Sequence, residues 1–243
     1  EARDSFGEDP FEVKNILKYW VLSEKQEFHV IPTDTINIHI DKDALLRSGI
    51  MLPKTIRHLK GEDLKDAIPD KLYIPLTDIR MLTKVDLLML EMLANCNWER
   101  PLYLAISVGS VSKLKFDNYF VQEGLAFRFT PFDYKKWGDV GENRLYAVDV
   151  ERLYDNVMNR YKYGGLDTPG LYLDETTLRT CWYHRRLFAQ LAKELIAQGD
   201  NERAKKVLAY AEQVIPGYNV PETHESGSYD IATAYAALGE KTK

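Results

Sequence analysis

The carboxylates best placed for acid–base or ligand chemistry lie in a Gly/Pro-rich stretch, KYGGLDTPGLYLDE. Gly164 and Gly165 can adopt positive φ angles there. Asp167 can cap a turn before Pro169, and Asp174 closes the stretch. Ligand sites favour junctions between subdomains, so this segment could hold a small polar ligand. A well-specified structural turn accounts for the same residues.

Histidines and cysteines could supply metal ligands at two places. His29 and His39 fall in the polar phase of alternating segments, where two histidines and a carboxylate would suit zinc or iron, although a solvent-facing histidine is common there. Cys181 and His184 lie about one helical turn apart and could share a metal, although a half-buried helix pair is the commoner arrangement. The chain has two cysteines, Cys96 and Cys181, which are too few for a disulfide framework. The sequence is compatible with one bridge between them or with two free thiols. We predict no metal and no cofactor.

Motifs of nucleotide and acyl-transfer chemistry are missing from the sequence. It contains no GxGxxG, no GxxxxGK[ST] and no GxSxG. Ser110 follows Gly109 after an apolar run, but Val108 stands where a nucleophile turn needs glycine. We interpret Ser110 as a coil hydroxyl and predict that this chain is not itself an enzyme.

Composition excludes several classes of protein. With 243 residues, 45% hydrophobic and 28% charged, the chain is neither a disordered tail nor a coiled coil, and it can bury one or two cores. A formal net charge of −5 gives no basic excess for nucleic acid. The longest uncharged stretch of the central region, Pro101 to Ser112, is about half of the ~20 residues of a membrane helix, so no membrane span is expected. Because the start lacks both an initiator Met and a signal-like apolar run, we expect a fragment of a longer protein.

Hydrophobic periodicity predicts an α/β unit over residues 1–148. A helix is expected over 10–22 with Asp9 as its N-cap, then alternating strand character through 36–40. Asp41 should cap a short helix that ends before Gly49. Residues 53–72 are charged and are predicted to be irregular.

The centre of this unit has the pattern strand, helix, strand. Residues 72–76 and 102–108 are continuous apolar runs, and 85–93 is a strongly apolar helix between them. The short connections predict a parallel βαβ unit, with 102–108 as a central strand covered on both faces. Residues 125–130 add a further strand in a small mixed sheet, and 133–145 have the composition of a surface loop.

Residues 149–243 are predicted to be all-α. Helices are expected over 150–161, 176–198, 201–215 and 228–238. From residue 176 the pattern is tetratricopeptide-like, with large apolar, small and turn residues at the repeat's offsets: Phe188, Leu191, Ala192, Leu195, Gly199, Ala204, Leu208, Ala211 and Pro216. A second first-helix follows, with equivalent spacing at Ile231, Ala232, Tyr235 and Gly239. One and a half repeats cannot form a solenoid alone, so the helix pairs should pack against the α/β unit. The loop 217–226 is longer than this repeat normally uses.

Four segments taken together carry a family resemblance: DALLRSGI at 43–50 and the segments 87–109, 117–131 and 153–175. Their order resembles the C-terminal soluble region of a bacterial multi-pass membrane protein family of unknown function. The N-terminal membrane part of that family looks like a GT-C glycosyltransferase related to protein O-mannosyltransferases. The departures are the charged segment 53–70 and an end after half a repeat.

The resemblance implies a location and a set of motif positions, but no catalytic residue, because the family's presumed catalytic acids lie in membrane-side loops outside this sequence. The chain would be periplasmic, tethered to the inner membrane through a membrane-embedded N-terminal part of the same polypeptide. The matched motif positions are Asn97, Trp98, Arg100, Glu123, Gly124, Arg128, Gly164, Gly165, Asp167 and Asp174. They could be binding residues or architectural ones.

Three hypotheses for function follow. The leading one is a non-catalytic periplasmic accessory domain that binds or positions a protein or glycan acceptor for a glycosyltransferase-like membrane part. The second is a free-standing ligand-binding or hydrolase-like α/β protein, with a site between the subdomains near Trp98, Asp167 and Asp174. The third is a purely structural or dimerisation domain.

Overall fold

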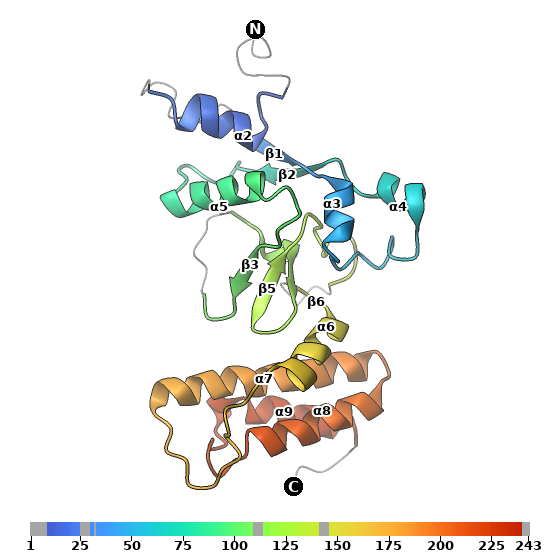
Figure 1. Ribbon diagram of the computed structural model, residues 1–243, viewed down its shortest axis with the longest axis vertical. Helices are drawn as coiled ribbons and strands as arrows, with labels where there is room; N and C mark the ends of the chain where they lie inside the picture. The colour runs from blue at the N-terminus through green and yellow to red at the C-terminus, as the bar shows by residue number, and fades with distance from the viewer. Residues whose placement is uncertain (1–8, 25–29, 32, 109–113, 141–145, 240–243) are drawn as a thin grey trace. The chain divides into compact units, whose positions relative to one another are not determined.

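The computed structural model of the protein describes residues 9–24, 30–31, 33–108, 114–140 and 146–239 (Figure 1). The chain divides into two compact units. Unit 1 comprises Glu1–Val121 and Phe127–Ala147, and unit 2 comprises Gln122–Ala126 and Val148–Lys243. The division after residue 147 lies next to the predicted boundary at 148, and the short segment 122–126 joins the second unit. Unit 1 mixes helices with small sheets and unit 2 is helical, which confirms the predicted fold class.

The first part of unit 1 confirms most of the predicted local elements. Its helices and strands are α2 (Val13–Ile16), η1 (Leu17–Val21), β1 (Thr35–His39), α3 (Lys42–Arg47), α4 (Gly61–Ala67), β2 (Lys71–Pro75) and α5 (Lys84–Asn95). The Asp41 carboxylate accepts a hydrogen bond from the Ala44 N–H at 2.9 Å, so the predicted cap of α3 is confirmed. The N-cap of α2 is Glu12, not Asp9.

The prediction of an irregular 53–72 segment was wrong, because α4 and the start of β2 lie inside it. The charges that suggested an exposed loop stabilise the helix instead. Glu62 and Asp63 occupy the first turn of α4, where negative charge is favourable. Lys65 forms ion pairs with Asp43 at 2.7 Å and with Glu62 at 3.7 Å.

The predicted parallel βαβ unit is contradicted by the sheet topology. β2 pairs antiparallel with β1, in a register that sets Ile36 opposite Ile74. β3 (Tyr103–Ala105) belongs to a different, four-stranded sheet, in the order β3-β5-β4-β6, with β4 (Phe120–Gln122), β5 (Ala126–Phe129) and β6 (Ala147–Val148). β3 is therefore a short edge strand, and Tyr103 is half-exposed rather than covered on both faces. An apolar run shows that a strand can form but does not choose its partner.

The core of unit 1 gathers side chains from both sheets and from α5. Ile36, Ile38 and Ile74 are at most 3% exposed, as are nearby α3 and α5 positions such as Leu45 and Leu90. Burial of each such side chain stabilises the fold by about 1.5–3 kcal/mol. α5 begins in a capping box, in which the Asp86 carboxylate accepts the Thr83 N–H at 2.7 Å.

Unit 2 confirms the four predicted helices to within a few residues. They are α6 (Val150–Asp155) with its continuation η4 (Asn156–Arg160), α7 (Glu175–Ala197), α8 (Asn201–Val214) and α9 (Ser228–Ala237), with the short η5 (His224–Ser226) before α9. α7 packs against both α8 and α9 (Figure 1). The predicted inward positions of the repeat are at most 3% exposed: Phe188, Leu191, Ala192, Leu195, Ala204, Leu208 and Ala211. Gly199, at φ 81°, makes the turn between α7 and α8.

Within the described ranges, no helix combines the length and the hydrophobicity that a membrane crossing requires.

Candidate functional site

Trp98 is held deep in unit 1 by a strained turn. Asn97 and Trp98 have φ angles of 47° and 61°, in the left-handed region that costs a non-glycine residue about 1–3 kcal/mol. The indole Nε1 donates to the His39 carbonyl at 2.8 Å, and the ring stacks on Phe129 with centroids 6.4 Å apart. These contacts give Trp98 a packing role at the end of α5.

The two predicted arginines of unit 1 have different environments. Arg128 is 3% exposed and donates to the Ser48 carbonyl at 2.9 Å, to the Ser48 hydroxyl at 2.8 Å and to the Gly49 carbonyl at 3.3 Å. A guanidinium at the carboxyl end of α3 is favourable because helix C-termini carry partial negative charge. Arg100, in contrast, is exposed.

Glu123 and Gly124 form a tight turn within unit 2. The buried Glu123 carboxylate accepts from Arg152 Nη1 at 3.1 Å, and its carbonyl accepts from the Asn156 amide at 2.7 Å. A Cβ on Gly124 would lie 2.1 Å from the Tyr161 hydroxyl oxygen, so no larger residue fits without movement. That hydroxyl accepts the Leu125 N–H at 3.0 Å.

The Gly/Pro-rich connector has the predicted glycine conformations, since φ is 63° at Gly164 and 73° at Gly165. Together with Asp167 they line a shallow hollow of about 420 Å³ in unit 2, where the small-ligand hypothesis would place its ligand. The hollow also contains the tyrosines Tyr161, Tyr163 and Tyr210. Asp167 is exposed, and its carbonyl accepts from the Tyr218 hydroxyl at 2.6 Å.

Asp174 is the N-cap of α7. Its carboxylate accepts from the Thr177 hydroxyl at 2.7 Å and from the N–H groups of Thr176 and Thr177 at 2.8 and 3.1 Å. These hydrogen bonds, chiefly those from Thr177, hold the pKa of Asp174 below its usual value. Asp174 and Asp167 belong to unit 2 and Trp98 to unit 1.

The side chains of Cys96, Cys181 and His184 are packed within the fold. Cys96 and Cys181 are free thiols in different units, and burial raises the pKa of each, which lowers its reactivity. The His184 ring packs edge-on against Tyr161 and Tyr163, and burial lowers its pKa. No cluster of three or more metal-ligating side chains occurs among the residues that the structure describes, and His29 of the predicted His29–His39 pair lies outside them.

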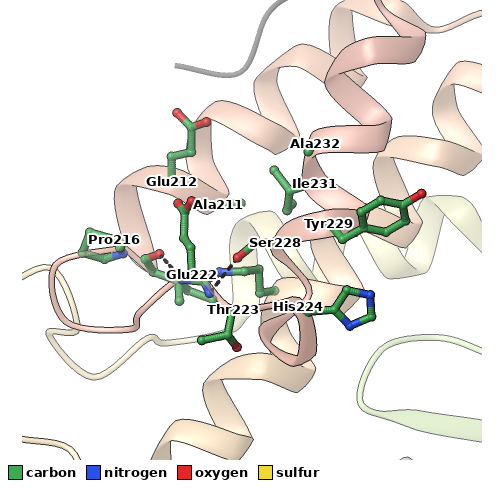
Figure 2. Close-up of a pocket in the computed structure, with 13 residues that line it drawn as sticks. Ala211, Glu212, Pro216, Glu222, Thr223, His224, Ser228, Tyr229, Ile231 and Ala232 are labelled. Atoms are coloured by element: carbon green, nitrogen blue, oxygen red, sulfur yellow. Dashed lines mark hydrogen bonds between the residues drawn. The ribbon is translucent and has the colours of Figure 1, made fainter.

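A second concavity of unit 2, which sequence reasoning did not predict, has more varied walls. It is a cavity of about 510 Å³ between the carboxyl end of α8, the loop that follows it and the start of α9 (Figure 2). The one sequence signal of this site was the loop 217–226, which is longer than the repeat normally uses. We call it the α8–α9 cavity.

Arg185 of α7 forms the base of the α8–α9 cavity. It is 5% exposed, and its guanidinium donates to the carbonyls of Val220 at 2.7 Å, Ile215 at 3.2 Å and Pro221 at 3.4 Å, and to the Ser228 hydroxyl at 3.4 Å. Burial lowers the pKa of Arg185, and the negative charge of Glu222 opposes this shift. A guanidinium stays charged under these conditions, so Arg185 ties the loop to α7.

The walls of the cavity combine apolar, acidic and aromatic groups. The apolar wall consists of Ala211, Ile215, Ile231 and Ala232, and the exposed rim consists of Glu212, Glu222, Thr223, His224 and Tyr229. The His224 and Tyr229 rings stack with centroids 5.9 Å apart, at 30°. The Ser228 hydroxyl bonds to Arg185 and lies 2.8 Å from the Ser226 hydroxyl. The Ser228 hydroxyl and the His224 ring thus have different partners, Arg185 and Tyr229.

Comparison with known proteins gives one family match. No curated protein and no solved structure matches the chain. The family model TMEM260-associated domain 2 matches residues 3–151, which is more than half of the chain and includes Trp98, Arg100, Glu123 and Arg128. The α8–α9 cavity lies beyond the matched residues. The chain therefore belongs to the TMEM260-associated domain 2 family, a family associated with a membrane protein.

Proposed function

We propose that this chain is a non-catalytic accessory domain of a glycosyltransferase-like membrane protein, and that its helical unit holds a polypeptide acceptor for the membrane-embedded part. In this proposal the domain works on the periplasmic side, tethered through the membrane part of the same polypeptide. Membership of a family associated with a membrane protein supports the accessory role. The resemblance of four sequence segments to the soluble region of a GT-C-like family supports the link to glycosyl transfer.

The α8–α9 cavity is the observation that carries the proposal. Its volume of about 510 Å³ falls within the ~300–1,000 Å³ typical of ligand sites. Its base is fixed by the Arg185 hydrogen bonds, so a ligand would meet a preformed surface. Its apolar wall and polar rim suit a polypeptide segment, which presents both apolar side chains and unpaired main-chain groups.

The binding role can be tested with a cavity-filling substitution and a matched control on the same helix. Ala232 lines the cavity, whereas Ala236, one turn later on α9, is exposed. The probe is reduced, carbamidomethylated ribonuclease A, an unfolded polypeptide, titrated calorimetrically into the purified chain. We expect binding that Ala232→Trp abolishes and that Ala236→Trp leaves intact.

Two results would contradict the proposal. One is equal binding of the unfolded probe by both tryptophan variants, which would show that the cavity is not the binding surface. The other is glycosyl transfer by the chain alone, without a membrane part, which would show that the domain is itself catalytic.

A further inference from the structure

We propose that the α8–α9 cavity selects a polypeptide segment carrying a cationic side chain, lysine or arginine. This inference rests on the proposed polypeptide-binding function and names the class of ligand that the cavity recognises. Three features of the cavity match the charged head, the methylene stem and the backbone of such a residue.

The charged head of such a side chain would meet two carboxylates. Glu212 on α8 and Glu222 in the loop are both exposed at the rim. Of the lining residues the only cation is Arg185, which donates to carbonyls at the base and interacts with Glu222, so two carboxylates face one guanidinium. The rim therefore presents net negative charge, which attracts a cation and repels an acidic or phosphorylated segment.

The methylene stem of the side chain would cross the apolar wall. Ile231 and Ala232 belong to α9, and Ala211 faces them from α8. Figure 2 shows Ile231 between the two glutamates and the Tyr229 ring. Lysine and arginine bury their stems against apolar surface while their heads stay hydrated, which a short polar side chain cannot do.

The segment that carries the side chain would lie against the stacked aromatic pair. Tyr229 is 67% exposed although its ring is braced by His224 at 5.9 Å. An exposed tyrosine that stacks on a neighbouring ring offers contact area, and its hydroxyl can bond to a main-chain group. The pair thus places the backbone on one side of Ile231 and the charged head on the other.

The test compares short fluorescein-labelled Gly/Ser peptides that differ in one central side chain: arginine, its uncharged isostere citrulline, or leucine. Binding to the whole chain is measured by fluorescence anisotropy. We expect the arginine peptide to bind about tenfold more tightly than the citrulline peptide. The double variant Glu212→Gln/Glu222→Gln should lose this preference.

The matched control is Glu91→Gln/Glu202→Gln, which changes the net charge equally at two exposed glutamates outside the cavity. It should keep the preference. Equal binding of the arginine and citrulline peptides by the unaltered chain would overturn this inference. This comparison does not depend on the folding of any variant. If the unfolded ribonuclease still binds in that case, the proposed function survives. If neither it nor any peptide binds, both proposals fail.

Discussion

Arg185 Nη2 lies 2.7 Å from the carbonyl oxygen of Val220, a residue 35 positions further along the chain. This bond and its neighbour to Ile215 join the middle of α7 to the loop after α8. The loop has no helix or strand from 216 to 222, and these hydrogen bonds hold the carbonyls of Ile215 and Val220 against α7. One buried cation thereby shapes the site to which we assign the function.

Replacing Arg185 should therefore damage stability and binding together. Arg185→Met removes the donors of several buried carbonyls, and we expect the free energy of unfolding to fall by about 2–4 kcal/mol. Arg179→Met, which breaks only the exposed pair with Glu175, should cost less than about 1 kcal/mol. Urea denaturation followed by circular dichroism measures both. Equal losses for the two variants would show that the Arg185 network contributes little.

Gly124 should not tolerate a side chain while Tyr161 keeps its hydroxyl. A Cβ there would meet the Tyr161 oxygen at 2.1 Å, so Gly124→Ala should destabilise the protein by about 1–3 kcal/mol. Tyr161→Phe removes that atom, and the double variant should recover part of the loss, which a double-mutant cycle measures. Gly217→Ala is the control, since its Cβ would meet only the flexible end of Glu222 at 3.3 Å. Strict additivity of the two substitutions would contradict the clash.

The Trp98 hydrogen bond gives a prediction for unit 1. Trp98→Phe keeps an aromatic ring but leaves the His39 carbonyl without its indole donor at 2.8 Å. We expect a loss of about 1–3 kcal/mol from the missing bond and the smaller ring. Trp137→Phe, at a half-buried ring that packs edge-on against Phe132, should cost less. Thermal unfolding monitored in the near ultraviolet checks the order, and a reversed order would contradict it.

The Asp174 cap predicts a specific dependence of stability on pH. Because the folded pKa of Asp174 lies below the ordinary 3.8, its carboxylate stabilises the fold above that pH. The stabilisation is lost as the pH falls through the folded pKa. Asp174→Asn caps the helix without titrating, so the wild-type advantage in melting temperature near pH 7 should shrink near pH 3. A constant difference across this range would exclude the charged cap as its source.

Local patterns in the sequence predicted the helices well. The 3.6-residue period and the capping residues are short-range signals, so α7, α8 and α9 and the inward positions such as Phe188 and Leu208 followed from them. Asp41 capped α3 for the same reason.

Pairing and cavity formation depend on contacts far apart in the sequence, and those could not be predicted. The apolar runs 72–76 and 102–108 looked like neighbours, yet β2 pairs with β1 and β3 joins another sheet. The α8–α9 cavity depends on hydrogen bonds from Arg185 to carbonyls at least 30 residues away. Main-chain acceptors are present at every residue, so no sequence motif marks these bonds. Motif positions such as Trp98, Glu123 and Arg128 are buried and hydrogen-bonded within the fold. Because the sequence does not record burial, it could not distinguish a binding role from an architectural one at these positions.

Nuclear magnetic resonance can map the peptide-binding surface on the chain itself. Amide chemical shifts of the isotopically labelled chain are followed while the arginine-centred Gly/Ser peptide is added. We expect the largest changes at the cavity residues of 211–217 and 222–232, with Arg185 among the shifted signals. Saturable shift changes centred on the hollow near Gly164, or on unit 1, would contradict the assignment of binding to the α8–α9 cavity.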